Sequence, residues 1–220
     1  MTGHEKEFKF ILTQEEYERI RTNKEQLELI GETTYWNIYY DNPHGDLHKA
    51  GYTYRMSLIE NGEGRFRRPK LTFKGPKHKT EHGLHSCEEV EQYLSGPLTK
   101  DDFFLHYTLL LPDAQHTEPW KKIAHMADGH PHLYVVGSIK ICRTKFIYNG
   151  FIIELDRVSY SSDAHDFELE VETHDPETTY PLIVEFLKRH DIEPMPSHHG
   201  KQSRFWKFRK QHGMLPPFTW

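Results

Sequence analysis

The chain of 220 residues is poor in cysteine, in long apolar runs and in compact metal-binding motifs. Its two cysteines, Cys87 and Cys142, are far apart and outside any metal-type spacing, so a disulfide framework is not expected. No apolar run approaches the length of a membrane span. The first residues, MTGHEKEF, lack the apolar core of a signal peptide. These absences predict a cytoplasmic protein with no membrane segment.

The composition is polar for a globular protein. Hydrophobic residues make up 36% and charged residues 28%, which is typical of a protein that encloses charge. The formal net charge of −5 argues against binding to nucleic acid through overall charge. The 17 histidines are scattered, without an HExxH motif or a Cys/His cluster, so we assign none of them to a metal. The length suits one domain, which we expect to span residues 1–220.

The pattern of turns and apolar positions predicts an α+β fold. A helix is expected at 12–31, because Thr13 and Glu16 form a capping box and Gly31 can end the helix. Further helices are expected at 99–111, 118–128, about 177–190 and about 201–211. Strands are expected at 34–41, 52–60, 68–75, 85–94, 132–148, 150–161 and 166–174. Asn149-Gly150 is a hairpin signal between the two strands that flank it. Together these segments predict seven or eight strands, mostly antiparallel.

Charged residues alternate with apolar ones along several of these strands. In HEKEFKF, residues 4–10, one strand face carries Glu5, Glu7 and Lys9, whereas the aromatic residues point the other way. The same alternation occurs in five further strands, and in each of them one face carries the following residues: Glu168, Glu170 and Glu172; Glu154 and Asp156; Glu89 and Glu91; Lys70, Thr72 and Lys74; and Arg55 and Ser57. Arg143 lies in a strand whose faces are mixed.

This alternation favours a barrel with a charged interior over a sheet with one wet face. A solvated face would carry mixed polar residues, but here acids gather on some strands and bases on others. We therefore predict a closed or nearly closed β-barrel with a polar interior and with helices over its apolar outer face. A barrel of eight strands encloses roughly one small ligand. Carboxylates bind hard cations, and Lys and Arg bind phosphate oxygens. Both kinds in one cavity predict a site for a metal–polyphosphate complex.

The motif Glu5-Lys6-Glu7-Phe8-Lys9 resembles the ExExK motif of the CYTH superfamily, the triphosphate tunnel metalloenzymes. Other stretches resemble the family in the same order, and the resemblance runs from residue 4 to about 207. They are Tyr39-Tyr40-Asp41, Arg55, Leu71-Thr72-Phe73-Lys74-Gly75-Pro76, Glu89, Arg143, Leu155-Asp156-Arg157-Val158, Glu168-Leu169-Glu170 and Lys201.

The chain also departs from the family pattern. Ser57 stands where the third strand often carries a second arginine, and Lys70, one strand further on, is a candidate replacement. The stretch FELEVE offers three acids where two are usual, which leaves the register of the metal ligands open. Residues 95–132 match no family motif.

The resemblance implies a tunnel of eight antiparallel strands that binds a small-molecule triphosphate with one or two Mg²⁺ or Mn²⁺ ions. It implies a catalytic role for Glu5, Glu7 and Lys9. The implied phosphate-binding residues are Lys9, Arg55, Lys70, Lys74, Arg143 and Lys201. The implied metal ligands are Glu5, Glu7, Glu89, Glu154, Asp156, Glu168 and Glu170.

The leading hypothesis is a metal-dependent triphosphatase. A class IV adenylyl cyclase is the first alternative, although we identify no base-reading residues. A non-catalytic polyphosphate- or nucleotide-binding module is the second, but anion binding alone would not require the acids. The organic part of the substrate, the preferred metal and the oligomeric state stay open.

Several neighbouring residues have a simpler structural interpretation. Tyr39 and Tyr40 are expected to pack against other residues, and Asp41 to cap a turn. Arg204 and Arg209 are expected on a solvated face of the last helix.

Overall fold

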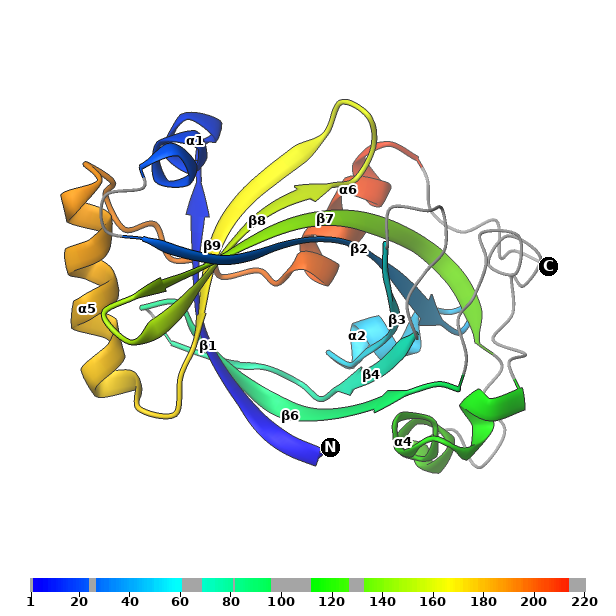
Figure 1. The fold of residues 1–220 in the computed structure, drawn as a ribbon. Helices are drawn as coiled ribbons and strands as arrows, with labels where there is room; N and C mark the ends of the chain where they lie inside the picture. Colours follow the sequence, from blue (N-terminus) through cyan, green and yellow to red (C-terminus); the bar gives the residue numbers. More distant parts are fainter. Residues whose placement is uncertain are drawn as a thin grey trace.

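The computed structural model describes residues 2–23, 27–60, 69–80, 82–95, 112–126 and 133–213. Eight antiparallel strands follow one another in the order β1-β9-β8-β7-β2-β3-β4-β6, and the pairing of β6 with β1 closes the barrel. A short ninth strand, β5, pairs with β6 outside the closed ring. Figure 1 shows the ring of strands with α1, α4 and α5 outside it. The predicted α+β fold with an eight-stranded antiparallel barrel is confirmed.

The strands are β1 (Thr2–Leu12), β2 (Glu28–Asp41), β3 (Thr53–Ile59), β4 (Lys70–Lys74), β5 (His78–Lys79), β6 (Leu84–Tyr93), β7 (Tyr134–Tyr148), β8 (Phe151–Ser159) and β9 (His165–Glu172). The helices are α1 (Gln14–Thr22), α2 (Asp46–Lys49), α4 (Glu118–Met126), α5 (Pro176–Arg189) and α6 (Lys201–Gln211), with a 3₁₀ turn at Pro112–His116. None of these helices combines the length and the apolar character needed to cross a membrane. Both cysteines are free.

The predicted helix at 12–31 is wrong in its second half. The capping box of Thr13 and Glu16 is present, but α1 ends at Thr22. Leu29 pairs with Phe146 of β7 instead, so this apolar stretch extends β2. The helix predicted at 118–128 is found as α4, and the last two predicted helices are found as α5 and α6. The helix predicted at 99–111 lies outside the described residues.

The outward-facing apolar side chains form two cores between the barrel and its helices. The core beneath α1 and α5 includes Phe10, Ile20, Leu169, Ile183 and Phe186. The core beneath α4 includes Ile38, Tyr40, Leu71 and Ile123. Burying each large apolar side chain contributes about 1.5–3 kcal/mol. Because these residues face outward, the alternate residues of the same strands are left to face the interior.

Helix α6 packs on the barrel where β2 ends and β7 begins. Phe205 stacks on Tyr39, with ring centroids 5.4 Å apart, and joins an apolar cluster inside the barrel. A Cβ atom at Gly137 would lie 2.7 Å from Cζ of Phe205, so β7 needs a glycine for this close approach. The Arg209 guanidinium donates to the Val136 carbonyl, so the expectation that Arg209 is solvated is wrong.

The segment before α6 is held to β1 and β6 by hydrogen bonds. The Ser197 amide donates to the Lys9 carbonyl at 2.9 Å, and Ile11 donates to the Met195 carbonyl at 2.9 Å. His85 Nε2 lies 2.6 Å from the Ser197 carbonyl oxygen, and Nδ1 of the same ring is buried without a hydrogen-bond partner. Burial lowers the pKa of His85 to about 4, so the folded protein holds this ring neutral.

We predict that His85 makes the protein less stable in mild acid. Below pH 6.5 the unfolded chain binds a proton that the folded chain, with a pKa of about 4, does not bind. Between pH 7.5 and pH 5 this difference removes about 2 kcal/mol of unfolding free energy. Denaturant unfolding at both pH values, for the wild type and for His85→Gln, should show a smaller loss in the variant. Equal losses would contradict this account of His85.

Candidate functional site

The barrel encloses a cavity of about 1400 Å³ that is lined by charges of both signs. The carboxylates of the lining are Glu5, Glu7, Glu89, Glu91, Glu154, Glu170, Glu172 and Asp175. The cations are Lys6, Lys9, Arg55, Lys70, Lys74, Lys77, Lys79, Arg143, Lys145 and Lys201. The structure therefore brings all six predicted phosphate-binding residues to one cavity. Of the predicted metal ligands, only Asp156 and Glu168 are absent from the lining.

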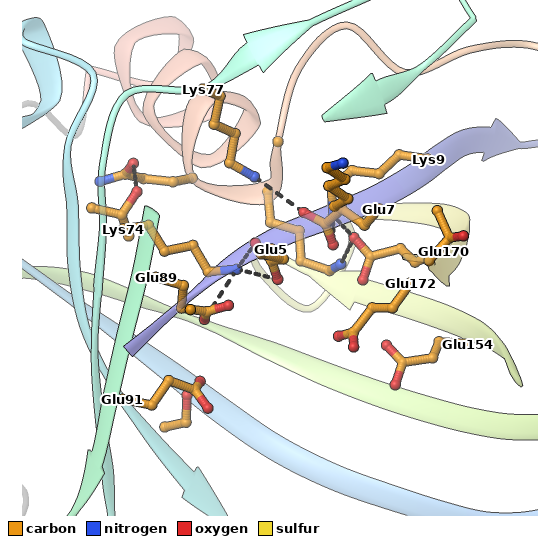
Figure 2. A pocket seen from close by; sticks show the side chains of 18 of the residues that line it. Glu5, Glu7, Lys9, Lys74, Lys77, Glu89, Glu91, Glu154, Glu170 and Glu172 are labelled. Carbon is orange, nitrogen blue, oxygen red and sulfur yellow. Dashed lines mark hydrogen bonds and ion pairs between the residues drawn. The ribbon is translucent and has the colours of Figure 1, made fainter. Parts of the chain in front are cut away.

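A first cluster of charges joins β1, β4 and β6. Lys74 Nζ lies 2.5 Å from Glu5 Oε2 and 3.3 Å from Glu89 Oε1. Figure 2 marks both contacts by dashed lines. Burial alone would lower the pKa of Lys74, but the carboxylates of Glu5 and Glu7 outweigh it and raise this pKa above its ordinary value. Burial raises the pKa of Glu5, and Lys74 overcomes that effect and lowers it to about 2. Both groups are therefore charged at neutral pH.

A second cluster surrounds Lys9 of the ExExK strand. Lys9 Nζ lies 2.8 Å from Glu7 Oε2 and also contacts Glu170. Lys77 Nζ lies 3.3 Å from the other oxygen of Glu7. Burial, reinforced by the positive charges of Lys201 and Lys77 against the raising effect of Glu7, lowers the pKa of Lys9 to about 7. Sequence reasoning missed Lys77, because it lies in the turn after β4 where strand alternation gives no direction.

A third cluster joins β7, β8, β9 and the start of α6. The Arg143 guanidinium donates from Nε and Nη2 to Asp156, at 2.7 and 2.5 Å, and from Nη2 to Glu170 at 2.6 Å. It also contacts Glu154. Lys201 Nζ lies 2.9 Å from both Asp156 Oδ2 and Glu170 Oε1. The strand with mixed faces in the sequence thus turns Arg143 toward the interior.

The acids of this third cluster lie close enough to share a cation. Oxygen atoms of Asp156, Glu168 and Glu170 lie within 4.8 Å of one another, and all three residues are buried. Carboxylate oxygens are the donors that Mg²⁺ and Mn²⁺ prefer, so this buried acidic cluster could bind a metal. Each of the three also contacts a lysine or an arginine, which compensates its charge.

Arg55 differs from the other cations of the lining. Its Nε atom is buried without a hydrogen-bond partner among the described residues. The next inward position of β3, Ser57, donates to Asn37 Oδ1 at 2.7 Å, so it supplies no cation here. Lys70 does line the cavity, but its Nζ lies 2.6 Å from Glu91 Oε1. Arg55 is therefore well suited to meet an anion that enters the cavity.

Tyr39, Tyr40 and Asp41 have the structural roles that were expected of them. Tyr39 and Tyr40 are both buried, as expected. Asp41 accepts hydrogen bonds from the amides of Leu47 and His48, at 3.0 and 2.9 Å, which confirms that it caps a turn.

The expectation for Arg204 is wrong. Only 13% of its side chain is exposed, and it contacts Asp166 and Glu168 of β9. The helical pattern of the last segment could not show that this face packs on a strand.

Comparisons with known proteins give the family and the fold of the chain. A family model described as the CYTH domain matches residues 3–197. No curated protein matches the chain. HpAC1 from Hippeastrum, described as a candidate adenylyl cyclase with a dominant triphosphatase activity, has a similar structure, with a TM-score of 0.75, 20% identity and coverage of 98% of this chain and 99% of that one.

Two further solved structures share the fold. A candidate adenylate cyclase from Bacillus halodurans has a TM-score of 0.64 and 21% identity, over 93% of this chain and 98% of that one. The PH1819 protein from Pyrococcus horikoshii OT3 has a TM-score of 0.60 and 19% identity, over 93% and 99%. At these identities the similarity shows the fold, and the family model shows the membership: the chain belongs to the CYTH domain family.

Proposed function

We propose that the protein hydrolyses a small triphosphate compound inside the barrel, with the help of a divalent metal ion. One observation carries the proposal: Lys9, Arg55, Lys74, Arg143 and Lys201, from four strands and one helix, line a single cavity together with opposing carboxylates. The triphosphatase activity described for HpAC1 supports the same reaction class.

The cations would bind and orient the phosphate oxygens. Hydrogen bonds between charged groups are roughly twice as strong as neutral ones, and a guanidinium such as that of Arg55 or Arg143 can donate two in parallel. Phosphoryl transfer needs mainly positioning of the reacting groups and stabilisation of negative charge. The spread of cations along the cavity would hold several phosphate groups at once, which favours a triphosphate.

The carboxylates on the cavity surface would hold the metal. Glu5, Glu7 and Glu170 line the cavity, and their present contacts are lysines and an arginine that can turn to the substrate instead. When bound, a divalent ion polarises phosphorus–oxygen bonds. Hard oxygen donors of this kind suit Mg²⁺ or Mn²⁺.

Glu172 is the acid that we propose as acceptor of a proton from the attacking water. It lines the cavity, and although the residue is exposed, partial desolvation and the charge of Glu154 raise its pKa above the ordinary value for a glutamate. A carboxylate with a raised pKa is a better base than an ordinary one. Sequence reasoning counted Glu172 among the acids of FELEVE without giving it a role.

The experiment that tests the proposal identifies the products. The protein would be incubated with tripolyphosphate, ATP and thiamine triphosphate in the presence of Mg²⁺ or Mn²⁺. Release of inorganic phosphate supports a triphosphatase. Cyclic AMP with pyrophosphate from ATP would instead identify an adenylyl cyclase, and binding without any product would identify a binding module.

We predict that triphosphates are much better substrates than compounds with fewer phosphates. Each charge-assisted contact that a shorter substrate cannot make is worth roughly 1.5–3 kcal/mol, so the loss of one should lower the efficiency about tenfold or more. Phosphate release from tripolyphosphate, pyrophosphate and p-nitrophenyl phosphate would be compared with and without chelator. Similar rates on all three, or full rates in chelator, would reject the proposed site.

We predict that Arg55→Gln weakens tripolyphosphate binding about tenfold or more and leaves thermal stability nearly unchanged. The reason is that the guanidinium gains a charge-assisted contact with the substrate. No ion pair of Arg55 is observed among the described residues, so its removal leaves no carboxylate there without a partner. The matched control is Arg157→Gln, an arginine on β8 that is exposed and absent from the cavity lining. Equal affinities of Arg55→Gln and the control would contradict the prediction.

We predict that Glu7→Gln abolishes turnover and weakens Mn²⁺ binding by roughly tenfold or more, since replacing even an outer partner of a metal site has an effect of that size. Isothermal titration with Mn²⁺ and circular dichroism would separate loss of metal binding from loss of fold. Glu88→Gln is the control, because Glu88 lies on β6 and pairs with Lys122 outside the cavity. Normal Mn²⁺ affinity in Glu7→Gln would remove this residue from the metal site.

A further inference from the structure

The first turn of α6 carries two cations that contact the same acid of β9. Lys201 lies at the cavity surface and contacts Glu168 in addition to Asp156 and Glu170. Arg204, three residues later, donates from Nη2 to Glu168 Oε2 at 2.5 Å. Lys201 takes the other oxygen, Oε1. Both oxygens of Glu168 are therefore engaged by α6.

This arrangement separates the three acids of the FELEVE stretch. Glu170 and Glu172 line the cavity, whereas Glu168 and Arg204 are absent from its lining. Glu168 is fully buried, and only 13% of the Arg204 side chain is exposed. The first acid of the stretch thus lies behind the cavity surface, where it faces the helix.

Arg204 also joins the segments on either side of the first turn. Its Nε donates to Asp166 Oδ2 at 2.7 Å, and its Nη1 donates to the His199 carbonyl at 2.6 Å. The N-cap residue, Gly200, offers no side chain to cap the helix. The carbonyl before the helix, the helix and β9 are therefore held together by one guanidinium, whose planar fork suits such multiple contacts.

We propose that Arg204 is a positioning residue that holds the Lys201 ammonium at the cavity surface, a role that rests on the proposed function. Lysine has a long and flexible side chain, so its place in the cavity depends on where the helix begins. Without Arg204, Glu168 would keep Lys201 as its only cation from α6 and would draw it away from the cavity. Lys201 would then contribute less to binding of a triphosphate.

The helix has a second attachment that does not involve Arg204. Phe205 packs on Tyr39 over Gly137, and Arg209 donates to the Val136 carbonyl. These contacts lie at the start of β7 and the end of β2, away from β9. A variant of Arg204 should therefore keep α6 on the barrel and change only the placement of its first turn.

The test is a double-mutant cycle with Arg204→Gln, Lys201→Gln and the double variant, with tripolyphosphate as the probe. Dissociation constants would come from calorimetry without metal, and KM and kcat from phosphate release with Mg²⁺. Arg204→Gln should weaken binding about tenfold in the wild-type background and less than about twofold in the Lys201→Gln background, because residues that act through one another are not additive. Arg204→Lys should recover part of the loss, and Lys207→Gln, on the exposed face of α6, should show none.

Equal effects of Arg204→Gln in both backgrounds, or no effect in either, would overturn the positioning role. Thermal unfolding of each variant would show whether the fold is intact. If Arg204→Gln does not fold, the same cycle with Arg204→Lys decides the question. A wild-type protein that does not bind tripolyphosphate would reject the proposed function and this inference together, whereas binding with additive effects would reject the inference alone.

Discussion

Compensation of buried charge is the constraint on which this structure depends. An ion taken out of water costs several kcal/mol unless a partner of opposite charge and good geometry replaces the lost hydration. In this barrel the compensation is shared: Glu170 is contacted by Lys9, Arg143 and Lys201, which come from three separate elements. The strand faces, the position of α6 and the shape of the cavity all have to satisfy this network. Another arrangement of the strands or of α6 would leave some of these charges without a partner, so the charged interior favours this one arrangement of the barrel.

The same network gives chemically identical side chains different properties. Burial favours a lowered pKa for both lysines. At Lys74 the carboxylates of Glu5 and Glu7 outweigh burial and raise the pKa. At Lys9 the charges of Lys201 and Lys77 reinforce burial against the effect of Glu7, and the pKa falls to about 7. The cations that face the cavity are thus not equivalent in their readiness to give up a proton. An anion that enters would compete with the carboxylates for these cations, and a divalent metal would take the place of the cations on the carboxylates. The resting ion pairs and the proposed complex are two arrangements of one set of charges.

The sequence was most informative where a local rule sets the direction of a side chain. Alternation along a strand is fixed by backbone geometry, so the inward placement of Glu5, Glu7 and Lys9 could be predicted without any knowledge of their neighbours. The boundary between α1 and β2 could not, because Leu29 becomes part of a strand only through its pairing with Phe146. Arg204 shows the same limit, since its contacts are with residues 36 and 38 positions earlier in the chain. Lys77 lies in a turn, where no periodic pattern applies.

The pairing of β1 has a consequence for how the protein folds. Residues 2–8 pair with β6, and Glu7–Leu12 pair with β9, the last strand of the barrel in chain order. The barrel can close only after strands separated by about 80 and about 160 residues have met the same N-terminal strand, and contacts between distant residues slow folding. Until then β6 and β9 each present an open edge, which can pair with another chain. The strand that carries the ExExK motif therefore joins both edges of the barrel wall, and closure of the barrel brings Glu5, Glu7 and Lys9 to the cavity.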